Sequence, residues 1–294
     1  MSKFDEVKIK YTVDVDRYSG LPVYKFKVYS NVEEFAKISG HRFVNLIMDD
    51  DYFSNDLQTL LGFLKLQPPI DSPYITCGNK LEQPIIDTVT QLYNMKDVET
   101  FSFEDLDNGT NDFHFIRDLE YTDENGERIT GEVKTFYNKQ KLTGWENVIP
   151  DIHLSWWLQL RLELEVLKEV GGKGRIFYYY VDKPSMNAVL NDRPFSIKMN
   201  NLFASDYIVK LNKDEKDPYI SQNLGHRGMH TFSDIEHQAF MKRDELALRY
   251  FDDDTGEIFY YVEVPIKYPW YAKSNHVENF IKETSQYIKI EEEN

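Results

Sequence analysis

The sequence predicts an α/β protein with a mixed central sheet flanked by helices. Residues 113–136 place β-branched and aromatic residues on both sides of Asn125-Gly126, which is the strongest short signal for a β-hairpin. Residues 155–170 carry apolar side chains at helical spacing, and residues 174–181 have the composition of a buried strand. The order strand, strand, helix, strand is typical of an α/β unit.

The N-terminal part of the chain predicts a hairpin followed by two helices. Residues 7–30 alternate between polar and apolar side chains on both sides of a turn, as a half-buried hairpin does. Asn31 can cap a helix whose first turn holds Glu33 and Glu34, where the helix dipole favours acidic groups. We expect a second, apolar helix at residues 57–66.

Three further elements complete the predicted fold. A helix is expected to open at Gly78, with Glu82 and Pro84 in its first turn, where a proline needs no N–H partner. Residues 245–264 predict a hairpin, and residues 275–288 predict a closing helix with Glu291, Glu292 and Glu293 frayed behind it. We expect an N-terminal hairpin at 1–30, a core at 31–184 and a C-terminal extension at 185–294 packed on the core in one continuous domain.

Composition limits the possible functions. The 294 residues are 41% hydrophobic and 15% aromatic, which indicates a folded chain. A single cysteine, Cys77, excludes an internal disulfide framework and any site made of several cysteines. The net charge of −16 has the wrong sign for a protein that binds nucleic acid over its whole surface. No secretory leader or run of about 18 apolar residues is present, so we expect a cytoplasmic protein with no membrane segment.

The second strand of the 113–136 hairpin contains a candidate site. Because side chains alternate along a strand, Glu132 and Lys134 share one face while the Val133 side chain lies on the other, with its carbonyl free at the edge. If the turn takes three residues, Thr122 lies opposite Arg128. The same register then places Asp118 opposite Glu132.

Two carboxylates and a backbone carbonyl form a donor set that suits a hard cation such as Mg²⁺. A neighbouring lysine can orient or deprotonate an attacking water and offset the negative charge that develops on a phosphate. The alternative is an ordinary solvated ion pair between Glu132 and Lys134.

Four motifs in order resemble the YqaJ-type, phage lambda exonuclease-like branch of the PD-(D/E)XK nucleases. Gly78-x-x-x-Glu82 is followed by an acidic residue in a strand, by Glu132-x-Lys134, and by a helix that bears Gln159 after two tryptophans. A further motif lies earlier in the chain: Ile38-Ser39-Gly40-His41-Arg42-Phe43 looks like the family's Ser-Arg-Phe element, although Gly40 and His41 separate its serine from its arginine. The resemblance covers roughly residues 35–181.

The sequence departs from the family pattern in several places. The aspartate of the family's proline–aspartate step corresponds to Asp118, but Asp112 and Glu120 remain alternatives. Thirteen residues separate Asp118 from Glu132, which is a longer gap than usual. Arg161 and Glu163 replace glutamines that often follow the first one.

The resemblance implies a restriction-endonuclease-like core and metal-dependent hydrolysis of phosphodiester bonds. It implies one or two Mg²⁺ or Mn²⁺ ions, held by Asp118, Glu132, the Val133 carbonyl and Glu82. Lys134 would position the attacking water, and Gln159 would orient the lysine or the DNA backbone. Ser39 and Arg42 would hold a DNA 5′-phosphate.

The resemblance also implies a biological setting. Relatives degrade linear double-stranded DNA from the 5′ end in phage or prophage recombination, as homo-oligomeric rings partnered by a single-strand annealing recombinase. A phage-encoded protein of this kind acts in the cytoplasm of its bacterial host. The alternatives are an endonuclease of the restriction or nicking type, and a catalytically inactive acidic scaffold that mimics DNA, which the charge of −16 favours.

Overall fold

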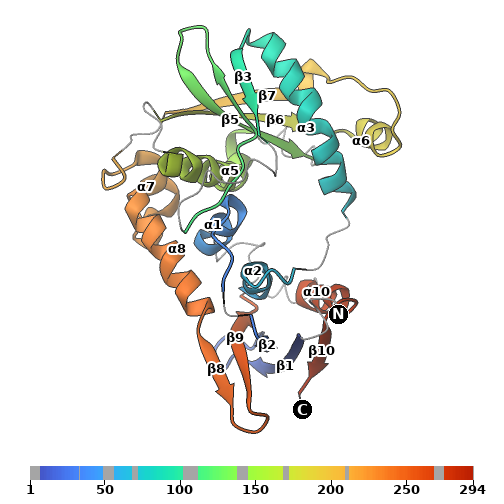
Figure 1. Ribbon diagram of the computed structural model, residues 1–294, viewed down its shortest axis with the longest axis vertical. Coiled ribbons are helices and arrows are strands. Elements are labelled where there is room, and N and C mark those ends of the chain that lie inside the picture. The colour runs from blue at the N-terminus through green and yellow to red at the C-terminus, as the bar shows by residue number, and fades with distance from the viewer. Residues whose placement is uncertain are drawn as a thin grey trace. The chain divides into compact units, whose positions relative to one another are not determined.

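The computed structural model describes residues 7–32, 34–48, 56–67, 72–101, 112–137, 145–167, 172–208, 212–267 and 275–293 (Figure 1). The chain forms two compact units, each assembled from separated segments. The first unit comprises Met1–Lys37, Asn45–Pro69 and His237–Asn294, and the second comprises Ile38–Val44 and Ile70–Glu236. The predicted domain boundaries near residues 30 and 184 remain predictions. Among the described helices, none combines the length and apolar composition that a membrane crossing requires.

The second unit contains a five-stranded mixed sheet in the order β3-β4-β5-β6-β7. Its strands are β3 (Lys96–Thr100), β4 (Leu119–Thr122), β5 (Arg128–Phe136), β6 (Lys173–Tyr180) and β7 (Leu202–Ile208). Only the β5–β6 pair is parallel among these neighbours, as expected for two strands joined by a helical crossover. The helices that begin in this unit are α1 (Gly40–Ile47), α3 (Pro73–Leu92), α5 (Trp145–Leu167), α6 (Lys183–Leu190), α7 (Pro218–Leu224) and α8 (Phe232–Leu246).

Helices cover both faces of this sheet (Figure 1). On one face, Leu81 and Ile85 of α3 pack in one apolar cluster with Val133 and Phe177. On the other face, apolar residues of α5 and β6 form a second cluster, which comprises Leu160, Leu164, Ile176 and Tyr178. The predicted α/β class, with a mixed central sheet flanked by helices, is therefore confirmed.

The β4–β5 hairpin has the predicted register. Thr122 lies opposite Arg128, and Gly126 has a φ of +80°, which a glycine adopts without strain. The ladder between the strands ends at the pair Leu119 and Gly131, so Asp118 and Glu132 follow it directly.

The prediction of a helix that begins after Asn31 is wrong. The described residues from 31 to 39 are not helical, and α1 begins only at Gly40. The Ile38 N–H donates to the Asp112 carbonyl, and the His114 N–H donates to the Ile38 carbonyl. These contacts with a distant segment satisfy the backbone groups that a helix would otherwise use.

The predicted start of the helix bearing Glu82 is also wrong. α3 begins at Pro73, whose fixed φ suits a first helical position, rather than at Gly78. Glu82 therefore lies in the middle of the helix, and Pro84 lies inside it, where its missing N–H removes one backbone hydrogen bond. In the same way, α5 begins at Trp145, earlier than the expected 155.

The first unit contains a second five-stranded sheet, in the order β10-β1-β2-β9-β8. Its strands are β1 (Lys8–Val15), β2 (Pro22–Tyr29), β8 (Arg249–Asp252), β9 (Glu257–Pro265) and β10 (Lys289–Glu292), and its helices include α2 (Asp56–Phe63) and α10 (His276–Thr284). The predicted N-terminal and C-terminal hairpins are both confirmed. The pairing of β2 with β9 joins them in one sheet, which local sequence patterns did not indicate.

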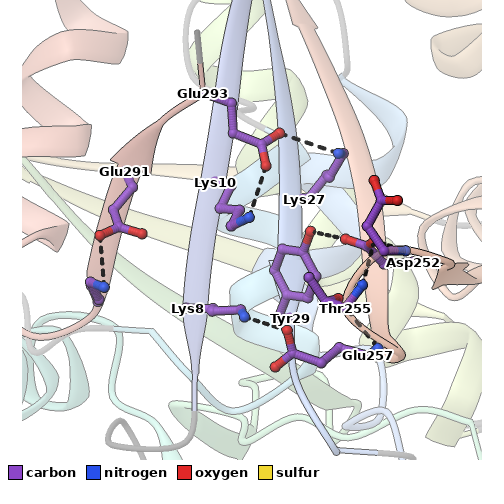
Figure 2. Close-up of polar contacts among 11 residues, drawn as sticks. Lys8, Lys10, Lys27, Tyr29, Asp252, Thr255, Glu257, Glu291 and Glu293 are labelled. Atoms are coloured by element: carbon purple, nitrogen blue, oxygen red, sulfur yellow. Dashed lines mark hydrogen bonds and ion pairs between the residues drawn. The ribbon is translucent and has the colours of Figure 1, made fainter.

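The C-terminal residues are not frayed as predicted. β10 pairs in parallel with β1, and the Glu293 N–H donates to the Tyr11 carbonyl. Figure 2 shows the Glu293 carboxylate between two lysines, 3.0 Å from Lys10 Nζ and 3.2 Å from Lys27 Nζ. An available sheet edge and two cations therefore hold a segment whose three glutamates repel one another in isolation.

Removing residues 289–294 is expected to lower the free energy of unfolding of the first unit by about 1–3 kcal/mol, because β10 and its backbone hydrogen bonds to β1 are lost. Urea denaturation of the full chain and the truncated chain measures this change. The matched variant Glu293→Gln keeps the strand and removes partly exposed ion pairs, so it should cost less than about 1 kcal/mol. Equal losses in the two proteins would contradict a stabilising role for the strand itself.

Candidate active site

Strand β5 and helix α5 bring together three of the predicted site residues. Glu132 and Lys134 project from β5 away from Val133, whose side chain lies in the α3 cluster. Lys134 Nζ forms an ion pair with Glu132 and donates to Gln159 Oε1 at 3.1 Å. Gln159 Nε2 in turn donates to Glu132 Oε1 at 2.7 Å. The three side chains therefore form a closed set of polar contacts between the sheet and α5.

Asp118 joins this group through the backbone of β5. Because β4 ends its pairing at Leu119, no main-chain carbonyl of β4 faces Val133, and the Val133 N–H donates instead to Asp118 Oδ2 at 2.6 Å. The N–H and C=O of one strand residue point to the same side, so the Val133 carbonyl also lies on the Asp118 side. The carbonyl was expected at a sheet edge. β5 is instead a central strand, and the early end of β4 leaves this position without a ladder partner.

The carboxyl groups of the site resist ionisation. Burial, and then the charge of Asp118, raises the pKa of Glu132 to about 8, and its side chain is only 1% exposed. Burial also raises the pKa of Asp118, against the opposing effects of Lys134 and the Val133 N–H. The pKa of Glu82 on α3 is raised by burial and by the charge of Asp118, which places Glu82 within electrostatic reach of the group.

Lys134 behaves in the opposite way. Burial lowers the pKa of its ammonium group, but the charges of Glu132 and Asp118 outweigh burial and raise the pKa above the ordinary value. The Lys134 side chain remains 22% exposed, whereas Glu132 beneath it is almost inaccessible. Lys134 is therefore a fixed cation that solvent or a ligand can reach, and it is not a base at neutral pH.

The two alternative acidic residues have other partners. Glu120 is buried and forms ion pairs with Arg117 and Arg128, and the distance from its Oε2 to Arg128 Nη2 is 3.1 Å. Asp112 is exposed, and its backbone carbonyl takes part in the bridge to Ile38. Of the three candidates, Asp118 is the one whose charge acts on Lys134.

The first turn of α1 lies beside Gln159. A Cβ atom on Gly40 would stand 2.7 Å from Gln159 Cγ, so a glycine permits this close approach. Ser39 Oγ accepts the Arg42 N–H at 3.3 Å and so caps the helix. Burial, followed by the charges of Lys134 and Arg42, lowers the pKa of His41. Ser39 and Arg42 thus belong to a helix turn that adjoins the group, and their contact with a DNA 5′-phosphate remains a prediction.

Glu163 is a member of the group that the sequence did not single out. It lies one helical turn after Gln159, is fully buried, and accepts a hydrogen bond from Gln159 Nε2 at 3.3 Å. Burial, and then the charges of Glu132 and Asp118, raises its pKa well above the ordinary value. The spacing of four residues from Gln159 is the sequence signal that could have identified it. We name these five residues the carboxylate–lysine cluster: Asp118, Glu132, Lys134, Gln159 and Glu163.

The cluster offers hard oxygen donors for a metal ion, although they are not preassembled. In the described parts of the chain, no three His, Cys, Asp or Glu side chains are gathered in a metal-binding group. Glu132 Oε2, however, is buried with no hydrogen-bond partner, and burial together with the charge of Asp118 raises the Glu132 pKa, so a cation beside it would favour the ionised form. The donor chemistry of Asp118, Glu132 and the Val133 carbonyl therefore fits an oxygen-ligated divalent ion.

Comparisons with known proteins find a distant likeness. No family model matches the chain, and no curated protein matches it. Two crystal structures of LHK-Exo, an alkaline exonuclease from Laribacter hongkongensis, are similar to this chain. The complex with dAMP has a TM-score of 0.42 and 11% sequence identity, and the other structure has a TM-score of 0.41 and 10% identity. Each alignment covers 71% of this chain and 87% of the LHK-Exo chain. The crystal structure of SSO0001 has a TM-score of 0.36 and 15% identity over 72% of this chain and 78% of that protein. Likeness at this level assigns neither a family nor a residue role.

Proposed function

We propose that this protein is a metal-dependent deoxyribonuclease. The observation that carries the proposal is the carboxylate–lysine cluster, in which Asp118 and Glu132 lie around the partly exposed ammonium group of Lys134. An ordinary surface ion pair would leave both partners hydrated, whereas Glu132 is nearly inaccessible and bears an oxygen with no partner. Burying carboxylates in this way is unfavourable unless a cation compensates for it.

The residues of the cluster have separate roles in this proposal. Asp118, Glu132 and the Val133 carbonyl would hold Mg²⁺ or Mn²⁺, and Glu82 would reach a second ion or its waters. A divalent ion there supplies Lewis-acid polarisation of the phosphodiester. Lys134, which stays protonated, orients the attacking water and stabilises the negative charge that develops on the phosphate. Gln159 orients Lys134 through the hydrogen bond at 3.1 Å.

The finer assignment follows the resemblance of the motifs to the exonuclease-like branch. We propose that the substrate is linear double-stranded DNA, degraded from the 5′ end, with Ser39 and Arg42 on α1 holding the terminal phosphate. The metal ions would also neutralise part of the repulsion between DNA and a chain of charge −16. A role in phage or prophage recombination, a homo-oligomeric assembly and an annealing recombinase as partner extend this proposal.

The test uses linear 5′-phosphorylated duplex DNA and closed circular DNA, each incubated with the purified protein in Mg²⁺ or in EDTA. We expect loss of the linear DNA alone, only in Mg²⁺, with a label on the 5′ nucleotide released first. Cleavage of circles would show an endonuclease. Absence of cleavage of either substrate by a folded sample would favour the inactive acidic scaffold.

A further inference from the structure

The amide of Gln159 is held at both ends. Its Oε1 accepts a hydrogen bond from Lys134 Nζ, and its Nε2 donates to both Glu132 Oε1 at 2.7 Å and Glu163 Oε1 at 3.3 Å. An amide NH₂ group has two N–H donors, so the two carboxylates use both of them. A flipped amide would turn its NH₂ toward the Lys134 ammonium group, which is unfavourable because both groups are donors.

The two acceptors of this amide differ in what else they do. Under the proposed function, Glu132 is a metal ligand, and a cation that draws its carboxylate would weaken the hydrogen bond from Gln159. Glu163 projects from α5 itself, one turn from Gln159, and has no such second role. It can therefore hold the amide while Glu132 turns to the ion.

We propose that Glu163 is a positioning residue that keeps the Gln159 carbonyl oxygen directed at Lys134 when a divalent ion occupies the site. The inference rests on the proposed function and gives a role to a residue that the motif resemblance treats only as a departure from the family pattern. Through Gln159, Glu163 sets where the Lys134 ammonium stands relative to the phosphate. Its effect is on the rate of the chemical step rather than on DNA affinity.

The burial of Glu163 argues against a space-filling role. The side chain is 0% exposed, its Oε2 has no hydrogen-bond partner, and the neighbouring positions 160, 162 and 164 of α5 are buried leucines. A leucine there would fill the space without the cost of burying a carboxyl group. What the carboxyl group adds over a leucine is the hydrogen bond that it accepts from Gln159.

The experiment compares Glu163→Leu and Glu163→Met, which remove the acceptor, with Glu163→Gln, which keeps one. Glu165→Gln is the matched control, because it alters a carboxylate of the same helix that pairs with Arg161 instead. The first readout is the rate at which the Gln159 side-chain NH₂ protons exchange with water, measured by NMR in Mg²⁺ and in EDTA. The NH₂ signals that disappear in Gln159→Leu are assigned to Gln159. The second readout is kcat and KM for linear DNA.

We expect Glu163→Leu and Glu163→Met to speed exchange of the Gln159 amide in Mg²⁺ and to lower kcat by about 10- to 100-fold at unchanged KM. Glu163→Gln should restore slow exchange and most of the rate, and Glu165→Gln should change neither. Unchanged exchange in both apolar variants, or a Gln variant as impaired as they are, would overturn the positioning role. If the wild-type protein cleaves no DNA, the proposed nuclease function fails, and the amide exchange still decides whether Glu163 holds Gln159.

Discussion

Replacing Lys134 with alanine is expected to reduce the rate of Mg²⁺-dependent DNA cleavage by about 10²- to 10³-fold. The Lys134 ammonium group stays protonated because Glu132 and Asp118 raise its pKa, and it is the member of the cluster that combines a fixed charge with 22% exposure. Its removal takes away the cation that would stabilise the negative charge developing on the phosphate. Initial rates on linear duplex DNA, measured with substrate in excess, give the change.

The matched control is Lys173→Ala. Lys173 begins β6 of the same sheet but pairs with Glu127 at the β4–β5 hairpin, outside the cluster, so its loss should leave the rate unchanged. Circular dichroism must show that Lys134→Ala is folded, because the substitution removes a cation from among buried carboxyl groups. A folded Lys134→Ala protein that cleaves at the wild-type rate would place the chemistry elsewhere in the chain.

In EDTA, the free energy of unfolding is expected to fall by on the order of 3 kcal/mol as the pH rises from about 5 to about 8. The pKa of Glu132 is about 8 in the folded protein, far above the ordinary glutamate value of about 4.3 that applies when the chain is unfolded. Between these two values the folded state binds more protons than the unfolded state, so raising the pH favours unfolding. Saturating Mg²⁺ should remove most of the loss, because the ion binds the ionised carboxylates.

Urea denaturation across this pH range, with EDTA or with Mg²⁺, measures the effect. Glu132→Gln cannot ionise, so its stability should depend less on pH and respond less to Mg²⁺ than that of the wild-type protein. Glu127→Gln removes an exposed carboxylate of the same hairpin and should keep the wild-type profile. If the stability of the wild-type protein in EDTA did not change with pH, Glu132 would already be ionised at neutral pH and its pKa would not be raised.

Local sequence patterns were sufficient to predict the centre of the candidate site. Asn125-Gly126 and the alternation on both sides of it predicted the hairpin and its register, and this register led to Asp118 opposite Glu132. The helical spacing of apolar residues at 155–170 predicted the helix that carries Gln159. These features depend on turn geometry and on side-chain alternation, which act over a few residues and can be read directly from the sequence.

Contacts between distant segments decided the rest. Ile38 forms backbone hydrogen bonds with residues 112–114 where a helix was expected. The C-terminal segment that was expected to fray pairs with β1 as strand β10. Glu163 looked like a substituted glutamine in the sequence, and only the packing of α5 on the sheet placed it against the Gln159 amide. Local rules determined which way each side chain points along its own element. Which groups meet depended on hydrogen bonds and burial between elements, whose free energies outweigh local propensity and cannot be read from short segments.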